Sequence, residues 1–400
     1  MPSLREFTAG PWRAVPVLGV TQILAWGAIY YPPVLTVPLI AAERGWSLTF
    51  AMGGFSLALL TAGLASPRVG RSIDRYGGHR VMPLGSLIGA LGLLLLIYVD
   101  HPVAYLAVWM VLGVAIAGSL YDPAFATLGR IFGTTARRPI TALTLAGGFA
   151  STVSWPATRV LIDTVGWRGT YLVYAAMLAL VAAPLHALAL PRTRAGVTAP
   201  RDSHEQVPSA VFPPQGWPFI LVAAAFAAYA FVPSGLSAHL LAIFGRAGID
   251  AATVVTIGAL FGPAQVAARI GELVFARRIH PLNVARFAIG MLLLAFALLA
   301  LAGLSVATAA TFAVMFGLAN GLITIARGAV PLALFGAAGY GHLVGRIGGP
   351  FLVMQAIAPL VLAFIAERTS DPAVLAVVAA FALVSFVGFA LVRRPGVRGS

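Results

Sequence analysis

Long apolar segments constrain this chain more than any other feature of its sequence. A helix crosses the hydrocarbon core of a bilayer with about 20 mostly apolar residues, and segments of this kind recur from one end of the chain to the other. The first segment is too long for the core of a signal peptide, so we interpret it as a retained span. We place twelve spans, at about residues 14–40, 47–69, 81–98, 102–128, 141–163, 170–190, 217–244, 252–276, 284–302, 306–335, 343–366 and 373–392. The sequence therefore predicts an all-α membrane protein with twelve transmembrane helices.

The composition agrees with a membrane protein and disagrees with a soluble one. Charged residues make up 10% of the chain and apolar residues 60%, whereas soluble domains carry about 25% charged residues. A net charge of +14 is also typical of proteins that bind nucleic acid. Here all 26 basic residues are arginines, and most lie in short loops between apolar segments. This placement indicates membrane topology, so the expected partner is the lipid bilayer and not nucleic acid.

The arginines also predict an orientation. With the N-terminus inside, four arginines fall in outer loops (Arg44, Arg168, Arg246 and Arg368) and three fall within spans (Arg159, Arg269 and Arg327). The remaining 26 − 4 − 3 = 19 then lie on the cytoplasmic side. Short cytoplasmic loops carry an excess of basic residues. We therefore expect a multi-pass protein of the cytoplasmic (inner) membrane with both termini in the cytoplasm.

The chain is expected to consist of two related halves. A polar stretch at residues 191–216 separates an N-terminal six-helix bundle, residues 1–190, from a C-terminal one, residues 217–400. Short matches between the halves recur at offsets of 200 to 203 residues, from Pro33 with Pro233 to Pro156 with Pro359. Two pseudo-symmetric repeats that enclose a substrate near the membrane midplane are a transporter architecture. We expect such a chain to work as a monomer on a small-molecule substrate.

Enzyme chemistry finds no support in the motifs. The chain has no cysteine and no lysine, which excludes thiol chemistry, thiolate metal sites and the lysine of an ATP-binding P-loop. Neither the G-x-S-x-G elbow nor the H-E-x-x-H zinc motif occurs, and GYGHLVG at 339–345 has the wrong spacing for a P-loop. We therefore expect no enzymatic activity, no cofactor and no metal. A receptor or scaffold role fits less well, because charges lie inside the spans of a duplicated chain.

The loop between the second and third spans, GRSIDRYGGHR at 70–80, concentrates charge in an otherwise apolar chain. It resembles the signature loop of the major facilitator superfamily, G-x-x-x-D-R-x-G-x-x-R, and matches it at Gly70, Asp74, Arg75, Gly77 and Arg80. Gly70 permits close helix approach, and Asp74 suits the positive N-terminal end of a helix, which we expect to be the eleventh. The resemblance implies a cytoplasmic gate at these five residues. The alternative is that the loop charges only set topology.

Polar residues inside spans are costly and mark functional sites by default. Arg269 and Arg327 suit the carboxylate of an anionic substrate, since a guanidinium binds a carboxylate through two parallel hydrogen bonds. A salt bridge from Arg269 to Glu272 is the alternative, and Arg159 is expected to pair with Asp163. Glu272 and Asp122 are the candidates for proton coupling. The other predicted substrate-binding residues are uncharged: Gln265, Tyr30, Tyr31, Asn320 and Tyr121.

Within the superfamily the chain is most similar to the monocarboxylate and oxalate/formate transporter group. SLYDPAFATLGRIFGTTARRP at 119–139, GWRGTY at 166–171 and GWS at 45–47 resemble that group's motifs. The group's arginine in the eighth helix corresponds to Arg269. Two other functional positions depart from its pattern, because Gln265 stands where the group has an aspartate and Pro33 where it has a lysine.

The resulting functional prediction is a secondary transporter of a small, monocarboxylate-like organic anion that works by alternating access, with or without a coupled proton. The alternative is a proton-driven exporter of drugs or amphipathic metabolites. That exporter would use the aromatic side chains of the cavity, with Asp122 as its proton carrier.

Overall fold

A computed structural model describes residues 10–192, 215–276 and 279–392 of the chain. All regular secondary structure in these residues is helical, with no strand. The chain forms two compact units. The first unit contains the described residues up to 192 together with Gly339–Gly349, and the second contains the described residues 215–338 and those from Pro350 onward. The predicted division into residues 1–190, 191–216 and 217–400 stays a prediction.

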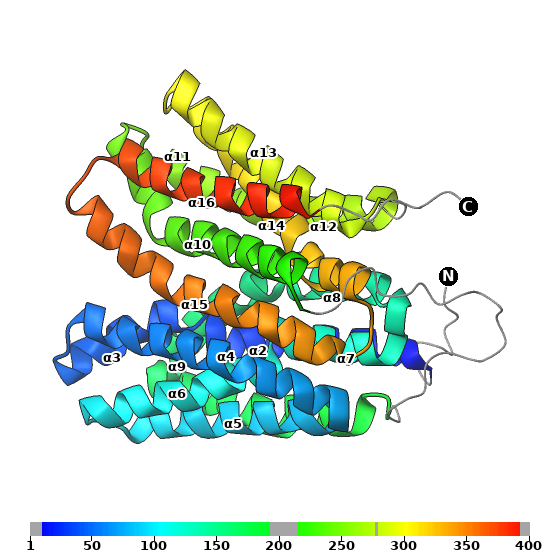
Figure 1. The fold of residues 1–400 in the computed structure, drawn as a ribbon. Coiled ribbons are helices and arrows are strands. Elements are labelled where there is room, and N and C mark those ends of the chain that lie inside the picture. The colour runs from blue at the N-terminus through cyan, green and yellow to red at the C-terminus, as the bar shows by residue number, and fades with distance from the viewer. Residues whose placement is uncertain (1–9, 193–214, 277–278, 393–400) are drawn as a thin grey trace, which may run out of the picture. The chain divides into compact units, whose positions relative to one another are not determined.

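The first unit is built from apolar helices that pack side by side, with α4, α5 and α6 adjacent to one another (Figure 1). In chain order its elements are η1 Pro11–Arg13, α2 Ala14–Ala25, η2 Trp26–Tyr30, α3 Pro33–Arg44, α4 Leu48–Tyr76, α5 Gly78–Tyr98, α6 Pro102–Ser119, α7 Tyr121–Phe132, η3 Gly133–Thr135, α8 Arg137–Gly147, α9 Ala150–Met177, η4 Leu178–Ala182 and η5 Leu185–Ala189.

The second unit has fewer interruptions in its helices. Its elements are α10 Trp217–Arg246, α11 Ala251–Ala259, α12 Phe261–Phe275, α13 Pro281–Ala302, α14 Val306–Phe335, α16 Asp371–Leu391 and the part of α15 Tyr340–Ala366 from Pro350 onward. Helix α14 packs on α12 and α13, and α16 packs on α10 and α13 (Figure 1).

Eleven helical segments in the described residues are long and apolar enough to cross a membrane. One of them, Arg137–Ala189, has 53 residues, which at 1.5 Å per residue is about 80 Å and more than twice a bilayer core. The backbone leaves the helical conformation inside this segment at Gly166, where φ is 72° and ψ is 174°. The segment therefore turns at Gly166 and forms two spans. This division confirms the prediction of separate spans at 141–163 and 170–190 and gives twelve spans in the described residues.

Two helices of the first unit are interrupted near the middle of their spans. In the Pro11–Arg44 span, Trp26–Tyr30 is a π-helix in which the Tyr31 amide donates to the Trp26 carbonyl at 3.0 Å. Pro32 and Pro33 follow directly, and the wider turn accommodates proline rings that would clash with carbonyls four residues earlier in an α-helix. In the Pro102–Thr135 span, α6 ends at Ser119 and α7 begins at Tyr121. Interrupted helices at this depth are typical of transporter binding sites.

Candidate functional site

Arg269 is the most deeply buried charge of the second unit. It lies on α12, one turn after Gln265, and only 4% of its surface is exposed. Its Nη2 donates to the Gln265 Oε1 at 3.4 Å, which is a long hydrogen bond. Its Nε and Nη1 have no hydrogen-bond partner among the described residues, and within them Arg269 forms no ion pair with Glu272. A buried guanidinium with two unused donors is strongly unfavourable unless a further acceptor arrives.

Two polar side chains on neighbouring helices belong to the same region of the second unit. The Tyr229 hydroxyl of α10 donates to the Asn320 Oδ1 of α14, and Tyr229 is within electrostatic range of Arg269. Helix α14 approaches α12 closely because Gly321 follows Asn320. A Cβ atom there would lie 2.6 Å from the Gln265 carbonyl oxygen. The structure therefore brings together three predicted residues, Gln265, Arg269 and Asn320, and adds Tyr229.

The other two charged candidates of the second unit, Arg327 and Glu272, lie further along α14 and α12 than Asn320 and Arg269. Arg327 is seven residues after Asn320 on α14, or about 10 Å along the axis. Its guanidinium carbon lies 4.1 Å from the centre of the Phe351 ring, a cation–π contact. Glu272 is one turn beyond Arg269 on α12 and is 5% exposed.

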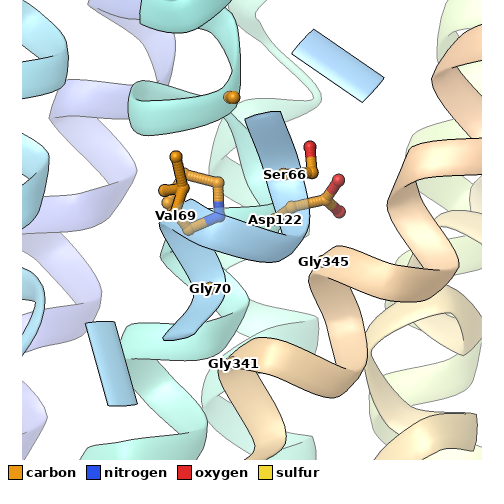
Figure 2. Close-up of a pocket in the computed structure, with 8 residues that line it drawn as sticks. Ser66, Val69, Gly70, Asp122, Gly341 and Gly345 are labelled. Carbon is orange, nitrogen blue, oxygen red and sulfur yellow. The ribbon is translucent and has the colours of Figure 1, made fainter. Parts of the chain in front are cut away.

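In the first unit, Asp122 occupies the first turn of α7, where a carboxylate interacts favourably with the positive end of the helix dipole. It is 8% exposed and lines a small pocket with Ser66 and Gly345 that is too narrow for a water molecule. Figure 2 shows its side chain directed toward α15. A Cβ atom on Gly348 would overlap the Asp122 Oδ2, so the α15 backbone packs against this carboxylate.

Asp74 lies at the end of α4 and accepts two hydrogen bonds from the first turn of α15. The Gly341 amide donates to Oδ1 at 2.8 Å and the His342 amide donates to Oδ2 at 2.7 Å. Both amides belong to the Gly339–Gly349 segment of the first unit. The carboxylate therefore satisfies two of the free N–H groups that every helix N-terminus leaves, at the helix where the sequence places this contact.

A row of glycines brings these two helices into backbone contact; we call it the glycine seam. On α15 it comprises Gly341, Gly345 and Gly349, four residues apart on one face, which meet the backbone of Gly70, Ser66 and Gly63 on α4. A Cβ atom on Gly70 would overlap the Gly341 carbonyl oxygen, and one on Gly345 would overlap that of Ser66. Small residues at this spacing are typical of tight helix pairs in membranes.

The arginines of the same loop behave differently from Asp74. Arg71, Arg75 and Arg80 are exposed, and their side chains make no hydrogen bond or ion pair within the described part of the chain. Arg75 lies over the ring of its neighbour Tyr76, at 5.2 Å. Gly77 has a φ of +84°, which only glycine adopts readily, and it turns the chain from α4 into α5.

The three predicted tyrosines of the first unit gather around one tryptophan. The ring of Trp26 lies 4.6 Å from that of Tyr30, 5.8 Å from Tyr31 and 5.1 Å from Tyr121, centre to centre. The Trp26 indole N–H donates to the Gln22 Oε1 at 3.1 Å. The Gln22 Nε2 in turn donates to the Ser119 carbonyl at 2.7 Å, where α6 ends. Gln22 thus connects the two interrupted helices.

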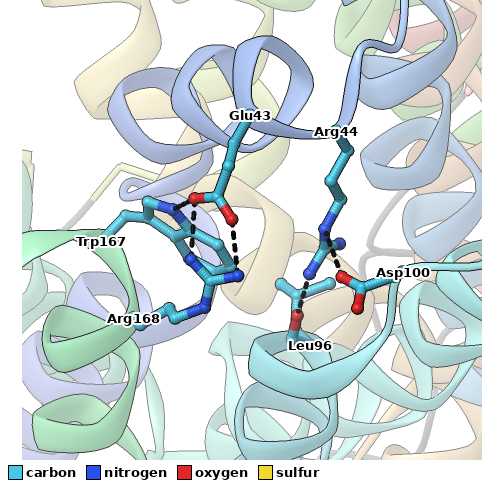
Figure 3. A network of polar contacts seen from close by, with 6 residues as sticks. All are labelled: Glu43, Arg44, Leu96, Asp100, Trp167 and Arg168. Atoms are coloured by element: carbon cyan, nitrogen blue, oxygen red, sulfur yellow. Dashed lines mark hydrogen bonds and ion pairs between the residues drawn. The ribbon is translucent and has the colours of Figure 1, made fainter.

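A second polar network joins the C-terminal end of α3 to α5 and α9 in the first unit (Figure 3). Glu43, at the end of α3, accepts from the Trp167 indole N–H and from Arg168 Nη1, both at 2.7 Å. The neighbouring Arg44 is ion-paired with Asp100 at 3.3 Å and donates to the Leu96 carbonyl at 3.0 Å. This network fixes the end of α3 to its neighbours, and it lies in the GWS and GWRGTY region singled out in the sequence.

A family comparison agrees with this architecture. A family model described as Major Facilitator Superfamily matches residues 18–316, about three quarters of the chain. The chain belongs to the major facilitator superfamily. It is therefore a membrane-embedded transporter of a small molecule and not an enzyme.

Curated relatives point to one group within the superfamily. The chain is 26% identical over 332 residues to monocarboxylate transporter 4 of Mus musculus, an alignment that covers 79% of this chain and 68% of the relative. It is 34% identical over 141 residues to monocarboxylate transporter 11 of Homo sapiens, covering 34% of this chain and 29% of that relative. The chain thus spans about two thirds of the first relative's length and less than a third of the second's.

Solved structures of other transporters share the fold. The human organic anion transporter MFSD10 (TETRAN) superposes with a TM-score of 0.72 at 17% identity, over 95% of this chain and 99% of that one. A bacterial homologue of the iron transporter ferroportin, in an outward-facing state, also gives 0.72, at 13% identity, over 94% and 98%. At these identities the likeness concerns the fold alone.

Several residues that shape this major facilitator protein were not among the predicted site residues. Tyr229 carried no sequence signal, because a lone tyrosine in an apolar span resembles many others. His186 is fully buried, with Nε2 2.8 Å from Thr21 Oγ1 and Nδ1 3.2 Å from Ser86 Oγ. The exposed ion pair of Arg159 with Asp163, at 2.9 Å, was predicted from their spacing and is confirmed.

Proposed function

We propose that this transporter moves a small organic anion with one carboxylate across the cytoplasmic membrane by alternating access. The observation that carries the proposal is Arg269, a 4% exposed guanidinium whose Nε and Nη1 have no hydrogen-bond partner in the described residues. A carboxylate supplies two oxygen acceptors at the spacing of two guanidinium N–H groups. The likeness to monocarboxylate transporter 4 supports the same substrate class.

Neighbouring side chains suit the remaining part of such a ligand. Gln265, Tyr229 and Asn320 provide amide and hydroxyl groups beside the guanidinium. Hydrogen bonds from such groups orient a hydroxyl or keto substituent next to the carboxylate. Arg327 is the second candidate for the anion, and its contact with Phe351 keeps its charge within the span.

Proton coupling is the second part of the proposal. Glu272 is one turn from Arg269, so a proton taken up by its carboxyl would change the charge next to the anion. Asp122, packed against α15 in the first unit, is the second candidate. A coupled proton predicts that an inward proton gradient drives anion accumulation, and that Glu272→Gln or Asp122→Asn abolishes the effect of the gradient while exchange at equal pH continues.

The contact between the end of α4 and the start of α15 is the proposed cytoplasmic gate. Gly70 and Asp74 hold the start of α15 against the end of α4. Gly77 turns the chain into α5 beside this contact, and Arg75 and Arg80 are exposed. We propose that this contact closes the cytoplasmic side of the transporter and breaks when that side opens.

We also propose the orientation and division of the chain that the sequence predicts, with both termini and the 191–216 linker in the cytoplasm. Topology reporters placed in the linker and at the C-terminus test this, because a periplasmic signal from either contradicts it.

Counterflow in proteoliposomes tests the substrate class. Proteoliposomes that contain the purified protein are preloaded with monocarboxylates, dicarboxylates or cationic dyes, and uptake of the labelled compound is measured with and without a pH gradient. Arg269→Lys is expected to reduce carboxylate counterflow severely, since a point charge does not replace the planar fork, and Arg269→Ala to abolish it. Arg159→Ala is the matched control, because Arg159 is 69% exposed and paired with Asp163. Counterflow of dyes without carboxylates would instead support a drug exporter.

A further inference from the structure

Aromatic residues around Trp26 in the first unit form a connected group that polar contacts alone do not explain. We call it the aromatic cluster. Trp26 is at its centre, in ring contact with three tyrosines. Phe55 of α4 lies 5.3 Å from Tyr30, and Trp155 of α9 lies 6.3 Å from Tyr31, each edge to face. The aromatic cluster therefore draws on four separate spans, and we define it as Trp26, Tyr30, Tyr31, Phe55, Tyr121 and Trp155. Further ring contacts lead from Tyr121 to Phe125 and from Phe55 to Trp109.

Hydrogen bonds and close packing hold the centre of the aromatic cluster in place. Trp26 and Tyr30 are the first and last residues of the π-helix, and Gln22 ties the Trp26 indole to the end of α6. Close packing fixes the turn from the other side, since a Cβ atom on Gly27 would lie 2.5 Å from the Ser154 hydroxyl of α9. Rings held in this way lose little further conformational freedom when a ligand contacts them, which favours binding.

The central rings of the aromatic cluster lie near the middle of their spans, unlike the tryptophan and tyrosine residues that are common at the membrane interfaces. Tryptophan and tyrosine are enriched at the two membrane interfaces, where their polar atoms reach the headgroups. Trp26 is the sixteenth of the 34 residues in its span, and Tyr121 is the twentieth of the 34 in its own. Polar ring atoms at mid-depth are unfavourable against lipid. Trp26, Tyr30, Tyr31 and Phe55 are nevertheless partly exposed, which suits a surface that meets a ligand.

We propose that the transported anion carries an aromatic ring, and that the aromatic cluster binds this ring by stacking and edge-to-face contact. The substrate class is then an aromatic monocarboxylate, such as a benzoate or an arylacetate, and not a short aliphatic acid. Aromatic pairs prefer offset-stacked or edge-to-face geometry and gain affinity beyond the area that they bury. The inference rests on the anion transport proposed above, and the ring contacts that it adds belong to the first unit alone.

A pair of ligands of equal charge and similar size tests the ring without testing the carboxylate. Benzoate and cyclohexanecarboxylate differ mainly in the π face, and acetate lacks the ring altogether. In wild-type proteoliposomes we expect benzoate to compete about two- to tenfold better than cyclohexanecarboxylate for each ring contact made, and acetate to compete weakly. The ratio of the two inhibition constants is the readout, because a general loss of folded protein lowers the transport rate and leaves both inhibition constants unchanged.

Variants of the aromatic cluster should change that ratio. Phe55→Leu and Trp26→Leu are expected to bring it toward one, and Trp26→Phe, which keeps a ring, to preserve most of it. Phe287→Leu on α13 is the control, since Phe287 is 65% exposed and lies in the second unit. Where Trp26→Leu does not fold, Phe55→Leu carries the test.

The outcomes distinguish this inference from the function on which it rests. Transport of acetate as effective as that of benzoate, or a wild-type ratio near one, overturns the aromatic substrate and leaves anion transport intact. A wild-type preference that persists in Phe55→Leu and Trp26→Leu removes the aromatic cluster from the site. Transport of aromatic cations without any carboxylate, unaffected by Arg269→Ala, would overturn both and assign the rings to a cation–π site.

Discussion

The contact between Asp74 and the first turn of α15 gives a prediction whose size follows from its geometry. The carboxylate accepts two amide hydrogen bonds, at 2.8 and 2.7 Å, one on each oxygen. In Asp74→Asn a single carbonyl oxygen remains, and the new NH₂ group faces the second amide. The variant loses one hydrogen bond to a charged group, about 1.5–3 kcal/mol, and a favourable charge at a helix N-terminus, about 0.3–1 kcal/mol.

These two losses overlap, because both describe the same carboxylate, so we take about 2 kcal/mol for the contact as a whole. Since each 1.36 kcal/mol is a factor of ten, the population with α15 docked on α4 should fall about thirtyfold relative to the undocked one. The protein has no cysteine, so a single introduced thiol reports without background. Ser66 is 3% exposed and lies in the glycine seam beside Gly345, so Ser66→Cys reacts only when the seam is open.

The assay compares thiol-labelling rates in membranes. In the Ser66→Cys background, Asp74→Asn should raise the rate by up to about thirtyfold, and the opening should appear from the cytoplasmic side. Arg71→Gln is the matched control, since the Arg71 side chain is exposed and makes no hydrogen bond or ion pair with a described residue. An unchanged rate in Asp74→Asn, or an equal rise in Arg71→Gln, would refute the reasoning and leave the loop charges as topology signals.

Three further predictions concern stability. Gly321→Leu should separate α12 from α14 and lower the melting temperature by several degrees, whereas Gly271→Leu, which meets no atom within 4 Å, should not. Glu43→Gln should lower the free energy of unfolding by about 0.5–1 kcal/mol, because both partners are more than a third exposed, and adding Arg168→Gln should cost little more in a double-mutant cycle. His186→Ala should cost about 2–4 kcal/mol, measured by thermal unfolding in detergent, since it leaves a cavity and two buried hydroxyls without their partner.

The spans and their number followed from the sequence because the bilayer imposes a length and a polarity on every helix. The two spans on either side of Gly166 were separable for the same reason, although their backbone forms one nearly continuous helical run. The contact of Asp74 with a helix N-terminus was predicted correctly, because a carboxylate is stabilised at the positive end of a helix dipole. The length and polarity of a span, and the preference of a carboxylate for a helix N-terminus, are properties of short segments and can therefore be predicted from the sequence.

The details of the site depended on which helices become neighbours. The bond from Tyr229 to Asn320 joins residues 91 positions apart, and no periodicity within either helix announces it. The spacing of Arg269 and Glu272 allowed an ion pair, yet the arginine side chain reaches Gln265 instead. GYGHLVG has the wrong spacing for a phosphate-binding loop, and two of its glycines, Gly341 and Gly345, belong to the glycine seam. For the Tyr229–Asn320 bond and for the glycine seam, the facing helix decides how the residues are used.

The glycine seam has a consequence for how fast its two helices can part. Its surfaces are backbone against backbone, so no side chain has to leave a rotamer well or slide past a neighbour when they separate. Separation breaks Cα–H to carbonyl interactions, each weak in energy, together with the two amide bonds to Asp74 and the contact between the His342 ring nitrogen and the Pro67 carbonyl oxygen. A seam held by two side chains, Asp74 and His342, and otherwise smooth has a low kinetic barrier for its stability. Opening and closing can then keep pace with repeated turnover, and the polar contacts of these two side chains set how long each closed interval lasts.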